Sequence, residues 1–201
     1  MQHRVGVLSI QGAISEHRHI LKKTFAEMGI RGEVNSVKKA EDLESIDALI
    51  IPGGESTTIG RLADRSGVSE KIKERVKRGM PVLGTCAGMI VMAKEILDLK
   101  AGKMSQENLS IMDISVIRNA FGRQRESFEV SLEIPKIDKK PFNAVFIRAP
   151  IVNKLLSKDV EVLAKYGKKI VAVQQRNMIA LSFHPELTED TRIFRYFIEL
   201  I

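Results

Sequence analysis

Short apolar runs alternate with longer amphipathic segments through the first half of the chain. The apolar runs have the length of buried strands, and the longer segments repeat apolar residues at helical spacing. This pattern predicts strands over 5–10, 32–37, 47–51 and 81–83 and helices over 13–28, 57–64, 69–78 and 87–97. Strands that alternate with helices in this order form βαβ units, so we expect a parallel sheet covered on both faces.

The second half of the chain changes to apolar runs separated by short turns. They predict strands over 111–117, 128–134, 144–147, 160–166, 170–174 and 178–183, followed by a helix over 188–201. We expect these strands to extend the same sheet in antiparallel or mixed order. The sequence therefore predicts one domain over 1–201, with a three-layer, flavodoxin-like α/β fold around a mostly parallel central sheet.

Composition narrows the class of protein. Hydrophobic residues make up 44% of the chain, enough for a core, and no run approaches the ~20 apolar residues of a membrane-spanning helix. The single cysteine cannot form an internal disulfide, and the first residues carry no secretory signal, so we expect a cytoplasmic protein. The net charge of +7 is interleaved with acidic residues and Trp is absent, which argues against nucleic-acid binding.

The strongest chemical signal is Gly84-Thr85-Cys86-Ala87-Gly88, between a predicted strand and a predicted helix. A nucleophile with a glycine two residues to either side is the pattern of a nucleophile elbow, here with Cys in place of Ser. The helix N-terminus favours the thiolate, and the N–H of Ala87 points to where an oxyanion would form. An isolated Cys is usually a small buried hydrophobe, but the elbow pattern favours a nucleophile.

A second signal is Phe183-His184-Pro185-Glu186, after the last predicted strand. In an extended chain His184 and Glu186 lie on the same side, so the carboxylate can orient the imidazole and stabilise its cation. A base that activates a thiol needs this support. A histidine at a strand end is more often structural, but together with the Cys elbow the pair favours catalysis.

Two glycine-containing turns also fall at the ends of predicted strands. Gly53 and Gly54 allow backbone N–H groups to approach a ligand, and Gln11 and Gly12 occupy the first turn between a strand and a helix. Ligands of open α/β sheets bind beyond the carboxyl ends of the strands, so we expect both turns near Cys86.

Metal binding is poorly supported. His17 and His19 are two residues apart on a predicted helix and cannot share a face, and the chain has no second Cys. We therefore expect no metal site, and we expect His3, His17 and His19 at the surface.

Five motifs, in order, resemble the triad-type class I glutamine amidotransferases, and within them the glutaminase subunits of pyridoxal 5′-phosphate synthase. They are PGGESTT at 52–58, GTCAG at 84–88, RNAFGRQ at 118–124, FIRAP at 146–150 and SFHPELT at 182–188. The first and last types of motif occur across amidotransferases, whereas RNAFGRQ and FIRAP are the specific ones. The resemblance runs from residue 5 to the C-terminal helix and implies a class I glutamine amidotransferase-like fold.

The resemblance implies hydrolysis of L-glutamine. Cys86 would attack the carboxamide to form a γ-glutamyl thioester, while His184 passes a proton to the departing ammonia and later activates water. Glu186 would hold His184, and the backbone N–H groups of Gly54 and Ala87 would form the oxyanion hole.

It also implies a glutamine site lined by Gly53, Gly54, Glu55, Arg118, Ile147 and Arg148. The chemistry agrees, because an arginine can pair bidentately with the α-carboxylate of glutamine. Without the resemblance, Arg118 or Arg148 would be interpreted equally well as a solvated charge at a strand end.

In this family the ammonia passes to a separate (β/α)8-barrel subunit that makes pyridoxal phosphate, and the glutaminase chain holds no cofactor. Gln11 and Gly12 match the element that partner binding rearranges, so we expect the isolated chain to be nearly inactive. The segment 98–109, between the elbow helix and the next strand, is longer than we expect for this family. We expect it to lie away from the matched motifs.

Three other functions remain open. A subunit of a different class I amidotransferase would share the triad but lack the motifs at 118–124 and 146–150. An α/β-hydrolase relative carries its acid before the histidine, whereas here the order is nucleophile, base, acid. A non-enzymatic binding module is the third, and failure of Cys86 to react with a glutamine-analogue electrophile would favour it.

Overall fold

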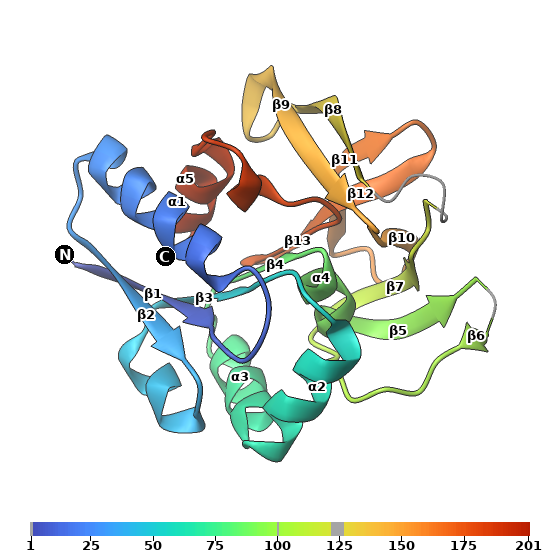
Figure 1. Ribbon diagram of the computed structural model, residues 1–201, viewed down its shortest axis with the longest axis horizontal. Coiled ribbons are helices and arrows are strands. Elements are labelled where there is room, and N and C mark those ends of the chain that lie inside the picture. Colours follow the sequence, from blue (N-terminus) through green and yellow to red (C-terminus); the bar gives the residue numbers. More distant parts are fainter. Residues whose placement is uncertain (1, 100, 122–126) are drawn as a thin grey trace.

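The computed structural model describes residues 2–99, 101–121 and 127–201 (Figure 1). Within these residues the centre of the molecule is a mixed sheet of eleven strands. One half is parallel, with strands in the order β2 (Gly32–Val37), β1 (His3–Leu8), β3 (Ala48–Ile51), β4 (Val82–Thr85) and β13 (Met178–Leu181). The carboxyl ends of these strands therefore lie at one edge of the sheet, where ligands of such folds bind.

Two hydrophobic clusters, one on each face of the sheet, hold the helices. Side chains of β3 alternate between them, because Leu49 and Ile51 join one cluster while Ala48 and Ile50 join the other. The first face packs against η1 (Ala40–Ser45), α2 (Ser56–Arg65), α3 (Val68–Lys77) and α4 (Ala87–Met92), and the second against α1 (Ile14–Met28) and α5 (Arg192–Ile198) (Figure 1). A sheet between two helical layers confirms the predicted α/β fold.

The other half of the sheet is largely antiparallel. After β13 the order is β12 (Lys169–Gln175), β10 (Ile151–Leu155), β7 (Met112–Arg118), β5 (Ala93–Asp98) and β6 (Gly102–Lys103), and β11 (Val160–Tyr166) pairs with β12. In this half β5 and β7 pair in parallel. The strands of the second half thus extend the sheet in mixed order, as the turn-rich pattern predicts.

Two of the expected strands, 128–134 and 144–147, do not join this sheet, so the prediction of a single sheet is wrong for them. They form β8 (Ser127–Ile134) and β9 (Asp138–Ile147), a separate two-stranded ribbon. Aromatic packing accounts for the position of the ribbon. Phe128 stacks on Phe146 with 4.8 Å between ring centroids, and the Phe146 ring lies 5.6 Å from that of Phe183.

Two predicted helices are shorter than expected. The helix over 87–97 ends at Met92, and the chain continues from Ala93 as β5. Every residue of α4 is buried, so it has no polar face to continue as an amphipathic helix, and pairing with β7 takes the residues that follow. The helix over 188–201 begins at Arg192, whose N–H donates to the carboxylate of Asp190. No helix among the described residues is long and apolar enough to cross a membrane.

Candidate active site

Cys86 lies at a sharp turn between β4 and α4. Its backbone has φ 50 and ψ −103, a conformation that residues other than glycine rarely adopt. Its thiol is 3.6 Å from the carbonyl oxygen of Ile147. Glycine is required on both sides of the turn. A Cβ added to Gly84 would lie 2.8 Å from the carbonyl carbon of Gly88. A Cβ added to Gly88 would lie 2.1 Å from the backbone oxygen of Ile51. The geometry is that of a nucleophile elbow.

His184 lies beside Cys86 and is supported by Glu186 from behind. Nδ1 of His184 is 2.7 Å from Oε1 of Glu186, and both side chains are buried. The backbone N–H of His184 donates to the backbone oxygen of Val145 in β9. A Cβ on Gly53 would lie 2.5 Å from Cε1 of His184 and 3.4 Å from Cβ of Cys86, so only glycine lets the loop close over this pair.

The electrostatics favour a charged imidazole. Burial by itself would lower the pKa of His184, but its interactions with Cys86 and Glu186 outweigh burial and raise the pKa to about 10. The histidine therefore holds a proton at neutral pH, as expected of a thiolate–imidazolium pair.

The two peptide groups of Gly53 are each held by one hydrogen bond. The Gly53 oxygen accepts from the Ala13 N–H at 3.1 Å, and the Gly53 N–H donates to Oγ1 of Thr85 at 3.1 Å. Because N–H and C=O of a trans peptide point in opposite directions, the Gly54 N–H points away from the Gly12–Ala13 turn. Gly54 and Ala87 both line the pocket that contains Cys86, which places the two predicted oxyanion donors at one cavity.

A pocket of about 410 Å³ brings the predicted residues together. Its size suits an amino acid. Glu186 is the exception, because it lies behind His184 rather than at the pocket wall. The predicted residues that line the pocket are Gln11, Gly12, Gly53, Gly54, Glu55, Cys86, Ala87, Arg118, Ile147, Arg148 and His184.

The pocket holds a carboxylate and a guanidinium close together. Nη2 of Arg118 is 3.4 Å from Oε1 of Glu55. Burial would raise the pKa of Glu55, but hydrogen bonds from Thr57 and Thr58 at the start of α2 lower it to about 2, so the carboxylate stays charged. Opposite charges close together in a pocket suit the α-amino and α-carboxylate groups of an amino acid. Arg148 is exposed.

The segment 98–109 is not remote from this site, contrary to expectation. Gln106 Oε1 and Met104 Sδ lie 3.4 and 3.6 Å from Nη1 of Arg118. The backbone of Glu107 packs so closely on α2 that a Cβ on Gly60 would lie 1.9 Å from its oxygen. The segment therefore supports the arginine from outside the pocket. Of the 118–124 motif, residues 122–124 lie outside the described residues.

His17 is fully buried, so the expectation that it lies at the surface is wrong. Its Nε2 lies 3.5 Å from Oε2 of Glu186. The signal was available, because the buried positions of α1 fall at helical spacing: His17, Ile20, Leu21, Thr24 and Phe25. Within the described parts of the chain, no group of three His, Cys, Asp or Glu is placed to hold a metal ion.

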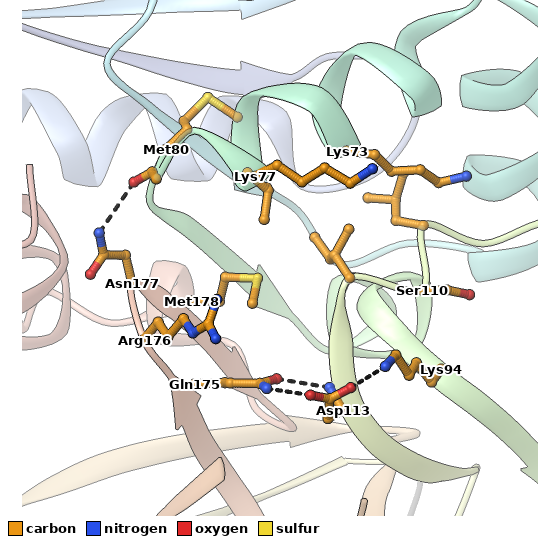
Figure 2. Close-up of a pocket in the computed structure, with 14 residues that line it drawn as sticks. Lys73, Lys77, Met80, Lys94, Ser110, Asp113, Gln175, Arg176, Asn177 and Met178 are labelled. Carbon is orange, nitrogen blue, oxygen red and sulfur yellow. Dashed lines mark hydrogen bonds and ion pairs between the residues drawn. The ribbon is translucent and has the colours of Figure 1, made fainter. Parts of the chain in front are cut away.

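A second cavity, of about 420 Å³, lies at the opposite edge of the sheet (Figure 2). Met80 and Met178, at the amino ends of β4 and β13, help to line it, whereas Cys86 follows the carboxyl end of β4. Asp113 in its wall is paired with Lys94 and accepts from Nε2 of Gln175 at 2.5 Å. None of the sequence-predicted site residues lines this cavity, so we do not assign the chemistry to it.

The likeness to solved structures places the chain among the glutamine amidotransferases by fold. A solved structure entitled "Crystal structure of glutamine amidotransferase" superposes with a TM-score of 0.85 at 48% identity, covering 98% of this chain and 97% of that one. A glutamine amidotransferase from Thermotoga maritima shares the fold at a TM-score of 0.62 and 14% identity, covering 98% of this chain and 83% of that one.

The sequence comparisons define the family. The profile of the SNO glutamine amidotransferase family matches residues 7–201, so the chain belongs to that family. A relative from Staphylothermus marinus is 52% identical, with 98% of each chain covered, and one from Methanopyrus kandleri is 48% identical, covering 98% of this chain and all of the relative. Both relatives are named pyridoxal 5′-phosphate synthase subunit PdxT.

Proposed function

We propose that this chain is the glutaminase subunit of a pyridoxal 5′-phosphate synthase, which hydrolyses L-glutamine and delivers the ammonia to a separate synthase subunit. The observation that carries the proposal is the single pocket in which Cys86, His184 and the Arg118–Glu55 pair meet. Membership of the SNO glutamine amidotransferase family and the names of its relatives support it.

The reaction begins at Cys86. Its thiolate, paired with the His184 imidazolium, attacks the carboxamide carbon of glutamine, and the oxyanion that forms accepts from the N–H groups of Gly54 and Ala87. The C–N bond breaks as His184 donates its proton to the leaving nitrogen, which departs as ammonia and leaves a γ-glutamyl thioester.

The neutral His184 then acts as a base. It takes a proton from water, the resulting hydroxide attacks the thioester carbon, and the C–S bond breaks to release glutamate and restore the thiolate–imidazolium pair. Glu186 holds the imidazole through both steps from 2.7 Å. Neither step needs a cofactor.

Substrate binding uses the charged residues of the same pocket. Arg118 pairs with the α-carboxylate and Glu55 with the α-amino group, while Gly53, Ile147 and the nearby Arg148 line the path of the side chain. The Arg118–Glu55 contact of 3.4 Å leaves both groups able to turn to the substrate.

The partner is a (β/α)8-barrel synthase subunit, and the assembly works in the cytoplasm. Gln11 and Gly12 would couple partner binding to catalysis, because Oε1 of Gln11 accepts from the Glu55 N–H at 2.8 Å and Gly12 packs on the Gly53 oxygen. A partner that moved this turn would move the oxyanion loop.

Ammonia release from glutamine tests the proposal, measured with and without the cognate synthase subunit for the wild type and Cys86→Ala. We expect release that depends on the partner and is lost in the variant. Release that ignores the partner would leave a glutaminase of a different amidotransferase, and no release under either condition would refute the proposal.

A further inference from the structure

His17 is a buried histidine that touches the acid of the proposed triad. It lies on α1 and is completely buried. Its Nδ1 is 2.7 Å from the Ala13 oxygen, and its Nε2 is 3.5 Å from Oε2 of Glu186 and 3.4 Å from Oγ1 of Thr85. The edge of its ring faces Phe194 of α5, with the ring centroids 6.1 Å apart.

The contacts define which nitrogen holds a proton. A carbonyl oxygen only accepts, so Nδ1 of His17 is protonated and donates to Ala13. Oε1 of Glu186 pairs with Nδ1 of His184, whereas Oε2 is buried and has no hydrogen-bond partner among the described residues, with Nε2 of His17 3.5 Å away. A proton on Nε2 of His17 would point at this oxygen.

An unpaired oxygen at this depth needs a donor. Burying a carboxylate oxygen without a partner is costly, and Nε2 of His17 is the nitrogen that faces Oε2 of Glu186. The other groups around His17 are the hydroxyl of Thr85 on β4, the ring of Phe194 on α5 and, on α1 itself, the exposed carboxylate of Glu16.

We propose that His17 is a positioning residue: it holds Oε2 of Glu186 through Nε2–H, on the side opposite His184, and so fixes the Cys86–His184 pair. The inference rests on the proposed function for its effect on turnover. The same residue also reaches the oxyanion loop, because Ala13 accepts from His17 and donates to the Gly53 oxygen.

Alkylation of Cys86 by iodoacetamide tests the proposal in the full chain without substrate, because Cys86 is its only cysteine. The pH profile of the alkylation rate is compared for the wild type, His17→Gln, His17→Asn and His17→Leu. The side-chain amide nitrogen of Gln takes the place of Nε2 of His17, and the side-chain amide nitrogen of Asn takes the place of Nδ1. The exposed His19 on the same helix supplies the control variant His19→Asn.

We expect the acid limb of the profile to move to higher pH by about one unit in His17→Asn and His17→Leu, because a buried Glu186 carboxylate that has lost its donor at Oε2 supports the His184 imidazolium, and with it the thiolate, less well. It should move less in His17→Gln, which keeps the donor, and not at all in His19→Asn. Equal shifts in Gln and Asn, or profiles that all coincide, would overturn the proposal even if melting temperatures fall, since lost packing alone affects Gln and Asn alike.

Turnover of the complex with the synthase subunit gives the second readout. His17→Asn should lower kcat for ammonia release about tenfold more than His17→Gln, with KM for glutamine unchanged. A rise in KM without a fall in kcat would contradict a role at Glu186. If the wild-type complex releases no ammonia, the proposed function fails, and the alkylation profiles still decide the role of His17.

Discussion

The substitution Gly12→Ala tests whether the first turn controls the oxyanion loop. Gly12 has φ 116, and an added Cβ would lie 1.9 Å from the Gly53 oxygen, about 1.5 Å inside the 3.4 Å of ordinary contact. The Gly53 carbonyl must therefore turn away, which breaks its bond with the Ala13 N–H and rotates the Gly53–Gly54 peptide. Loss of one oxyanion donor lowers kcat by roughly 10²–10³.

Gly29→Ala is the matched control for this substitution. Gly29 also has a positive φ, of 65, but nothing lies within 4 Å of its added Cβ. Both variants carry backbone strain, roughly 1–2 kcal/mol in the left-handed helical region of Gly29 and up to roughly 3 kcal/mol at the φ of Gly12, and only Gly12→Ala displaces the loop. Ammonia release by the complex with the synthase subunit is the assay. A kcat of Gly12→Ala that falls no further than that of Gly29→Ala, at comparable thermal stability, would refute a role of this turn in placing the oxyanion loop.

Four further substitutions test other parts of the site. Glu186→Gln removes the charge that helps to raise the pKa of His184 to about 10, so the alkaline limb of the kcat/KM profile should move to lower pH; an unmoved limb would contradict this. Arg118→Ala should raise KM for glutamine at least tenfold, because it removes the partner of the α-carboxylate. Gln106→Ala should raise KM by a smaller factor, because Gln106 only supports Arg118. Equal KM values for Gln106→Ala and the wild type would show that the segment 98–109 has no part in substrate binding. Gly88→Ala should destabilise the fold by about 1–3 kcal/mol in thermal unfolding, because its Cβ meets the Ile51 oxygen at 2.1 Å; an unchanged Tm would mean that the elbow relaxes.

The pattern of the sequence predicts the layers and the glycine, cysteine and histidine motifs that meet at the pocket, whereas Glu55, Arg118, Ile147 and Arg148 are implied only by the family resemblance. Glycines and a lone cysteine at strand ends define local geometry, because a turn such as that at Cys86 needs small neighbours whatever surrounds it. Parallel strands then bring their carboxyl ends together, which is why motifs at residues 53, 86 and 184 converge although they lie far apart in the chain.

What the sequence could not supply depends on tertiary contacts. The apolar run from Ala87 fits a buried helix or a strand equally well, and only pairing with β7 decides that it becomes a strand at Ala93. The ribbon β8–β9 leaves the sheet because its aromatic face packs on other rings. Likewise, the support of Arg118 by Gln106 depends on how the segment 98–109 folds back, which local pattern does not encode.

The most direct test of the account is the mass of the protein during turnover. The complex with the synthase subunit is mixed with glutamine, quenched in acid and analysed by intact-mass spectrometry, for the wild type and Cys86→Ala. The mechanism predicts one γ-glutamyl group on the wild-type chain, located at Cys86 by peptide mapping, and none on the variant. Ammonia release from the wild type with no adduct, or an equal adduct on Cys86→Ala, would contradict the thioester mechanism.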